Sequence, residues 1–300
     1  MAFTRRTPFL WKLLTRSLEL GRHTRVMGVI NVTPDSFSDG GRFLSAAEAV
    51  DCALAMFDEG ADIVDIGGES TRPGKLEPFT EAEEQHRVLP VIAGILQQRP
   101  DSLLSIDTYR AATARAAVAA GAQIVNDVSG LLWDEQMAGT CASLGCGVVL
   151  MHTRGRPGQW ARLPRLAQEE VVPLVKRQLR ERLAAALAAG ISAERLVLDP
   201  GFGFGKAYEN NYPLLSHLED LRELGQPLLA GVSRKSFLGR TLAGSSRLPA
   251  GQDVPVGERA HASLAATTAA MLGGSDIVRV HEVRSTVEAA AIADEILNAG

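Results

Sequence analysis

The sequence predicts an α/β protein built as a single (β/α)₈ barrel, with a short N-terminal extension at residues 1–24. Three observations support this fold class. Short apolar segments alternate about eight times with longer segments of helical spacing, the apolar segments are nearly uninterrupted, and no Pro/Ser-rich linker divides the 300 residues. Such segments are typical of a parallel sheet covered by helices. Because a barrel of this kind occupies roughly 250 residues as one unit, residues 25–300 are expected to form one domain.

The expected strands are rich in Val, Ile and Leu, and polar residues lie at or near the carboxyl ends of several of them. They are residues 26–32, 63–67, 103–107, 124–128, 148–151, 196–199, 228–232 and 277–280. Between them lie stretches with helical spacing, such as 46–59, 81–97, 169–189 and 259–272. The least regular stretch, 239–257, is expected to be a long loop. Residues 1–24 are expected to be an amphipathic lead-in and not a targeting signal, because Lys12, Arg16 and Glu19 interrupt any apolar run.

A weak internal repeat favours closure into a barrel over an open doubly wound sheet. Segments 60–65, 121–126 and 274–279 each begin with a glycine, which suits the end of a helix, and continue into an expected strand. The fifth residue after each glycine is polar, namely Asp65, Asn126 and Arg279. These three residues are expected at equivalent depths in their strands.

The overall composition argues against several classes of partner. A net charge of −4 does not favour a nucleic acid or an anionic membrane surface. No run approaches the ~18 apolar residues of a membrane span. The three cysteines lack CxxC spacing and are interpreted as packing residues, and reduced cysteines suit a cytoplasmic protein.

Polar side chains end several expected strands, where Val, Ile or Leu would be usual. In a barrel the carboxyl ends of the strands meet at one mouth, which is where active sites lie. One such residue would be interpreted as a satisfied structural hydrogen bond. Many of them converging from different strands indicate a binding site, because buried charge without a partner is costly. They are Asn31, Asp107, Asn126, Asp127, His152, Asp199, Ser233, Arg279 and His281.

These strand-end residues divide by chemistry. Asp107, Asn126 and Asp199 offer acceptors and amide donors that suit a flat polar heterocycle. Arg279 and His281 lie two apart on one face of a strand, and with Asn31 they suit a phosphate or a metal–phosphate unit. Glycine-rich loops follow the first, second and sixth strands at 35–41, 69–74 and 201–206, and the first two are expected to act as a lid. No P-loop, nucleophile elbow or HExxH motif is present.

At these residues the sequence resembles the dihydropteroate synthases, a family of pterin-binding TIM barrels. The resemblance runs from about residue 25 to the C-terminus. Its most specific motifs are MGVINVTPDSFSDGG at 27–41 and DIGGESTRPG at 65–74. Further matches lie at 105–108, 126–130, 198–206, 233–237 and 279–281. The chain departs from the family after Met151 and His152, where residues 153–156 (TRGR) stand in place of the usual methionine and glutamine.

The resemblance implies a transferase of folate biosynthesis, the target of sulfonamides. Such an enzyme joins 6-hydroxymethyl-7,8-dihydropterin pyrophosphate to 4-aminobenzoate and yields 7,8-dihydropteroate and pyrophosphate. The implied pterin-binding residues are Asp107, Asn126, Met151, Asp199, Gly203 and Lys235. Those implied for 4-aminobenzoate are Thr71, Pro73, Phe204 and Ser236. Those implied for pyrophosphate are Asn31, Arg279 and His281, with Mg²⁺ as the cofactor at Asn31. The implied catalytic group is Asn31, Asp35, Thr71, Arg72, Lys235, Arg279 and His281. A cytoplasmic homodimer is also expected.

The chemistry implied by the resemblance is an ionisation-type (SN1-like) displacement. Pyrophosphate leaves a carbon attached to an electron-rich ring, so catalysis requires stabilising the departing anion and excluding water. Two other interpretations stay open. A methyltetrahydrofolate–corrinoid methyltransferase shares the pterin-binding barrel but has no need of the clamp formed by Arg279 and His281. A non-catalytic paralogue would bind pterin or pyrophosphate without turnover.

Overall fold

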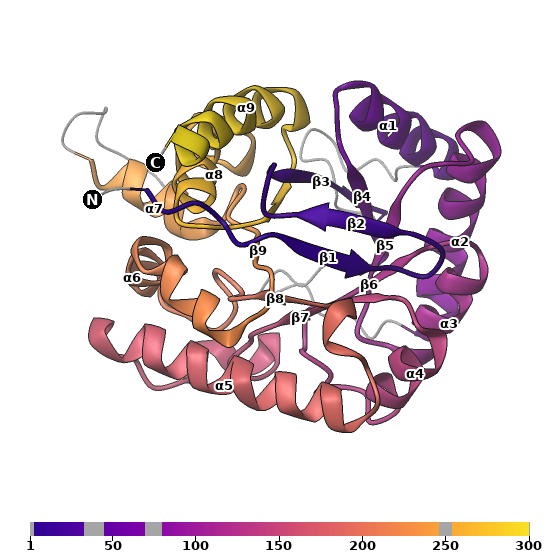
Figure 1. Cartoon of the computed structure of the whole chain (residues 1–300), viewed down its shortest axis with the longest axis horizontal. Helices are drawn as coiled ribbons and strands as arrows, with labels where there is room; N and C mark the ends of the chain where they lie inside the picture. Colours follow the sequence, from indigo (N-terminus) through magenta and orange to yellow (C-terminus); the bar gives the residue numbers. More distant parts are fainter. Residues whose placement is uncertain (1–2, 33–44, 70–79, 246–253, 300) are drawn as a thin grey trace.

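The computed structural model describes residues 3–32, 45–69, 80–245 and 254–299 and has the architecture of a β/α barrel. Eight parallel strands form one sheet in the order β8-β7-β6-β5-β4-β3-β10-β9. A parallel bridge between Leu198 and Leu228 joins its two edges, so the barrel is closed. The helices surround the strands (Figure 1). The predicted fold class is therefore confirmed.

All eight predicted strands are present, and three have the predicted bounds. The strands are β3 (Arg25–Asn31), β4 (Ile63–Gly67), β5 (Leu104–Asp107), β6 (Ile124–Asp127), β7 (Gly147–Met151), β8 (Leu196–Asp199), β9 (Leu229–Ala230) and β10 (Ile277–Val280). The α-helices are α1 (Ala46–Asp58), α2 (Glu81–Gln98), α3 (Ala111–Ala119), α4 (Met137–Leu144), α5 (Gln168–Ala188), α6 (Asn211–Ser216), α7 (Ser236–Ala243), α8 (Ala260–Leu272) and α9 (Val283–Ala299). The stretch 239–257 is not wholly a loop, because α7 occupies its beginning. None of the described helices is long and apolar enough to cross a membrane.

The helices α1 and α2 begin where their sequences supply a capping box. Ser45 and Thr80 accept a hydrogen bond from the backbone N–H of Glu48 and Glu83, and each glutamate accepts one in return from the cap residue's backbone. These contacts satisfy backbone donors that have no partner within the helix. The two capping residues therefore fix where α1 and α2 begin, at Ala46 and Glu81.

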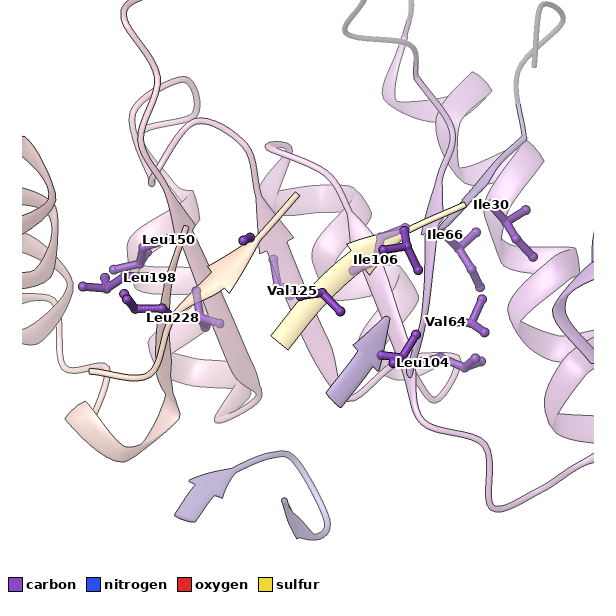
Figure 2. Packing of buried hydrophobic residues seen from close by; sticks show 14 of the residues in the cluster. Ile30, Val64, Ile66, Leu104, Ile106, Val125, Leu150, Leu198 and Leu228 are labelled. Atoms are coloured by element: carbon purple, nitrogen blue, oxygen red, sulfur yellow. The ribbon is translucent and has the colours of Figure 1, made fainter. Parts of the chain in front are cut away.

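Successive residues of each strand face the helices and the interior of the barrel in turn. On β4, Val64 packs in the large apolar cluster shared with the helices, whereas Ile63 belongs to a second cluster inside the barrel. Figure 2 shows helix-facing side chains of the large cluster, among them Ile66 and Leu150. Asp65 again faces inward, one layer above Ile63. Apolar side chains therefore fill the lower barrel, and polar side chains begin above them.

An antiparallel hairpin of β1 (Phe9–Lys12) and β2 (Ser17–Leu20) closes the amino-terminal end of the barrel (Figure 1). Its Trp11 and Leu20 are buried in the cluster inside the barrel. The indole N–H of Trp11 donates to the carbonyl of Arg195 (2.9 Å). Arg6 forms a buried ion pair with Asp294 of α9. The segment predicted as an amphipathic lead-in is thus a structural plug at the end of the barrel opposite the strand carboxyl ends.

Candidate active site

A cavity of about 340 Å³ lies at the carboxyl ends of the barrel strands, within the size range of small-molecule sites. Every site residue implied by the family resemblance that the structure describes lines this cavity. They are Asn31, Asp107, Asn126, Met151, Asp199, Gly203, Phe204, Lys235, Ser236, Arg279 and His281. The other predicted site residues, Asp35, Thr71, Arg72 and Pro73, lie outside the described residues. The structure thus brings the described candidates together, and their individual roles stay predictions.

Arg279 lies at the floor of the cavity between two carboxylates. Its Nε donates to Oδ2 of Asp65 (2.6 Å) and its Nη2 to Oδ2 of Asp107 (2.7 Å). Asn126 also donates to Oδ2 of Asp65 (2.9 Å). Burial raises the pKa of Asp107 to about 7, although the charge of Arg279 opposes that shift. Burial by itself would lower the pKa of Arg279, but the two carboxylates outweigh it and raise that pKa. Arg279 is therefore held charged.

The loop after β8 is shaped by buried polar contacts. The N–H of Gly201 donates to Oδ1 of Asp199 (2.6 Å), and Nζ of Lys206 donates to the carbonyl of Gly201 (2.6 Å). Burial raises the pKa of Asp199 and lowers the pKa of Lys206 to about 7. Gly201 has φ +66°, and a Cβ there would lie 1.9 Å from the carbonyl oxygen of His152. Only glycine fits at this position, which lets the loop fold back over the cavity.

A strained turn after β9 aims Lys235 into the cavity. Arg234 has φ +57°, which is unusual for a residue with a side chain. Its N–H donates to Oγ of Ser263 (2.9 Å) and its Nε to Oε1 of Glu282 (2.7 Å). Lys235 follows, with its ammonium 4.2 Å from the ring centroid of Phe204. The cation–π contact links Lys235, a candidate pterin-binding residue, to Phe204, a candidate aminobenzoate-binding residue.

His281 and Asn31 lie on the same side of the cavity as Arg279. The His281 ring nitrogen Nδ1 lies 3.0 Å from Oγ of Ser233, a contact that orients the imidazole. Arg279 and His281 come from the end of β10, which pairs with β3, and β3 ends at Asn31. Their adjacency follows from closure of the barrel, as the sequence predicts.

The opposite side of the cavity is apolar. Val128, Met151 and Phe204 form a small buried cluster. Trp160 lies edge-on to Phe204, with ring centroids 5.4 Å apart. Arg154, one of the residues that departs from the family pattern, donates to the carbonyl of Gly205 (3.0 Å). The departure therefore joins the loop after β7 to the loop after β8 and leaves the cavity residues in place.

Two polar strand-end residues predicted at the mouth do not face it. Asp127 is fully buried and accepts hydrogen bonds from the backbone N–H groups of Ser129 (2.7 Å) and Leu131 (2.9 Å) in the following turn. Nε2 of His152 lies 2.7 Å from Oε1 of Gln178 on α5. The reason is the alternation of side chains along a strand. Asp127 follows the inward-facing Asn126, and His152 follows the inward-facing Met151, so both face the helices.

Sequence reasoning also left out cavity residues that the structure identifies. Glu69 and Trp160 line the cavity, and Asp65 supports its floor. A signal for Asp65 was available, because the internal repeat places Asp65, Asn126 and Arg279 at one depth. No signal marked Trp160, which lies in a short 3₁₀ helix (Pro157–Arg162) after β7.

The family described as "Pterin binding enzyme" matches residues 27–281. The dihydropteroate synthase of Bacillus subtilis (strain 168) is 41% identical over 284 residues, which is 95% of this chain and 92% of that protein. The Yersinia pestis dihydropteroate synthase, solved with a sulfonamide drug complex, superposes with a TM-score of 0.87 at 39% identity, covering 97% of this chain and 100% of that one. The Xanthomonas albilineans dihydropteroate synthase with 4-aminobenzoic acid has a TM-score of 0.84 at 42% identity, covering 97% of this chain and 98% of that one.

Matches of this extent, together with a cavity lined by the residues that carry the resemblance, establish the family. The chain belongs to the pterin binding enzymes and, within them, to the dihydropteroate synthases.

Proposed function

We propose that this chain joins 6-hydroxymethyl-7,8-dihydropterin pyrophosphate to 4-aminobenzoate, yielding 7,8-dihydropteroate and pyrophosphate in folate biosynthesis. One observation carries the proposal. Acceptors for a flat heterocycle and a cationic group for a phosphate line a single cavity, and they meet where Arg279 contacts Asp107. A pterin that bears a pyrophosphate has the two features that this cavity matches.

The pterin ring would bind at the polar side of the cavity. Asp107 and Asp199 would accept hydrogen bonds from its amino group and ring nitrogens, and Lys235 would donate one. Met151 supplies an apolar wall for the face of the ring. Burial of both carboxylates makes these hydrogen bonds stronger than in water.

Displacement would begin with ionisation at the exocyclic methylene. The C–O bond breaks and its electron pair leaves on pyrophosphate, while the electron-rich ring stabilises the cation. Arg279 and His281 hold the departing anion. The lone pair of the 4-aminobenzoate amine then forms the C–N bond and the amine loses a proton. Because an aniline-type amine is uncharged at neutral pH, no strong general base is needed.

Mg²⁺ is the proposed cofactor, with Asn31 as its protein ligand. The described residues contain no group of three His, Cys, Asp or Glu that would hold a metal by themselves. That fits Mg²⁺, which commonly binds through one or two protein oxygens together with substrate phosphates. Asn31 lines the cavity, and its side-chain amide carries an oxygen of the kind that binds Mg²⁺. When bound with pyrophosphate, the ion would neutralise part of the leaving group's charge.

Amine-dependent release of pyrophosphate tests the function. Purified protein is supplied with the dihydropterin pyrophosphate and Mg²⁺, with and without 4-aminobenzoate, and dihydropteroate is measured as product. We expect release that depends on the amine, and heavy loss of turnover in Arg279→Ala. Tight pterin binding without product would instead favour a non-catalytic paralogue or the methyltransferase class.

A cytoplasmic homodimer is the proposed form of the enzyme. A groove of about 1150 Å³ between α5, α6 and α8 lies away from the active-site cavity and is lined in part by Val172, Leu215 and Leu272. An apolar groove on late helices supports pairing with a second copy. The cysteines are free, which suits a reducing compartment. Analytical ultracentrifugation should give twice the chain mass, and a monomer at micromolar concentration would exclude the dimer.

A further inference from the structure

Asp65 is a buried carboxylate that the proposed chemistry does not use. It is 0% exposed and is not among the described residues that line the cavity. A single oxygen, Oδ2, accepts from Nε of Arg279 (2.6 Å) and from Nδ2 of Asn126 (2.9 Å). Arg279 is one of the candidate pyrophosphate-binding residues, and Asn126 is one of the candidate pterin-binding residues. Asp65 therefore joins the two halves of the site from beneath.

We propose that Asp65 is a positioning residue that orients both Arg279 and Asn126 for the two parts of one substrate. The inference rests on the proposed function for the identity of that substrate. Asp65 itself does not touch the substrate, because it lies below the cavity floor.

Asp65 determines which atom Asn126 presents to the cavity. Oδ2 of Asp65 accepts the hydrogen bond from Asn126, so the amide nitrogen of Asn126 faces Asp65. The amide oxygen, Oδ1, is buried and has no hydrogen-bond partner among the described residues. Because Asn126 lines the cavity, this oxygen is available to accept a hydrogen bond from a ring N–H or an amino group. Replacing Asp65 by a neutral amide would remove this constraint and let Asn126 present its nitrogen.

Asp65 also shares the charge of Arg279 with Asp107. Nη2 of Arg279 donates to Asp107 (2.7 Å), the carboxylate that the pterin would use. The contact with Asp65 gives Arg279 a second carboxylate partner and fixes its guanidinium plane at Nε. Without the charge on Asp65, Asp107 would be the one remaining carboxylate of this pair that attracts the guanidinium of Arg279. The guanidinium would then compete with the pterin for that carboxylate and would turn away from the pyrophosphate.

The test compares Asp65→Asn with Asp127→Asn by calorimetric binding of two separate probes. The probes are inorganic pyrophosphate with Mg²⁺, and 6-hydroxymethylpterin. Asp127 is the matched control, because it is equally buried but faces the helices. We expect Asp65→Asn to weaken each probe about tenfold, the change that ~1.4 kcal/mol produces. Asp127→Asn should leave both affinities within about twofold, since its contacts are confined to a turn. Asp65→Ser carries the same expectation, should Asp65→Asn fail to fold.

A double-mutant cycle separates positioning from a general loss of structure. In an Arg279→Ala background, Asp65→Asn should no longer change pyrophosphate affinity, because Asp65 reaches that probe only through Arg279. Pterin affinity should still fall, because Asn126 remains. The proposal is overturned by unchanged affinity for both probes in Asp65→Asn, by an equal loss in Asp127→Asn, or by a full pyrophosphate effect in the Arg279→Ala background. These measurements need no turnover, so absence of amine-dependent pyrophosphate release would refute the proposed function alone.

Discussion

Replacing Arg279 with lysine should impair the enzyme even though the positive charge is kept. Arg279 uses Nε for Asp65 and Nη2 for Asp107, with distances of 2.6 and 2.7 Å. A guanidinium has five N–H donors in a fixed planar fork, so it can hold both carboxylates and keep donors for a third anion. A lysine ammonium has three donors on one nitrogen. We expect it to satisfy one carboxylate well and to lose the fixed orientation toward pyrophosphate.

The magnitude follows from the burial of the contacts. The Arg279 side chain is 19% exposed and that of Asp65 is 0% exposed, so solvent screens their hydrogen bond little. A hydrogen bond to a charged group contributes about 1.5–3 kcal/mol. Loss of one such contact predicts a fall in kcat/KM of roughly 10- to 150-fold. Arg279→Ala is less informative, because leaving buried carboxylates without a counterion costs about 3–5 kcal/mol of stability.

Steady-state pyrophosphate release, with kcat and KM for the dihydropterin pyrophosphate determined separately, is the assay. Thermal melting checks that the variant is folded. Arg284→Lys is the control, because Arg284 forms an exposed ion pair with Glu288 on the surface of α9 and should not affect turnover. If Arg279→Lys keeps kcat/KM within about twofold of the parent protein, charge alone suffices and the argument from fork geometry is wrong.

Three further predictions concern pH, backbone strain and the apolar wall of the cavity. Burial raises the pKa of Asp107 to about 7, and ligand binding favours the ionised form of this carboxyl group. The affinity for 6-hydroxymethylpterin should therefore rise up to about tenfold per pH unit toward pH 7 and then level. The Asp107→Asn variant, measured by calorimetry, should show no such pH dependence. Gly201→Ala should lower Tm far more than Gly225→Ala. Both glycines have positive φ, but only a Cβ at residue 201 would lie against the carbonyl oxygen of His152. Equal melting points of the two variants would contradict this. Trp160→Ala removes part of the wall and should weaken substrate binding several-fold with little change in Tm, since the side chain is only half-buried; unchanged affinity would show that the indole does not contact the substrate.

The eight barrel strands could be predicted because a parallel strand covered on both faces must be apolar along its length. For β4, β8 and β10 even the bounds were correct. The hairpin of β1 and β2 was not predicted. Each of its strands has only four residues with mixed polarity, and it is stabilised by contacts such as those of Trp11 that exist only once the barrel has formed.

The sequence by itself determined which polar residues end the strands and that Asp65, Asn126 and Arg279 share one depth. Both follow from local pattern, since apolar runs and glycines mark where strands begin and end. Only the tertiary structure decided that Asp127 faces the helices, and that Arg279 contacts Asp65, 214 positions away in the chain. That contact depends on strand pairing, because β10, the last strand in the sequence, pairs with β3, and β3 pairs with β4. Strand pairing, rather than spacing along the chain, therefore brings these polar residues together in one site.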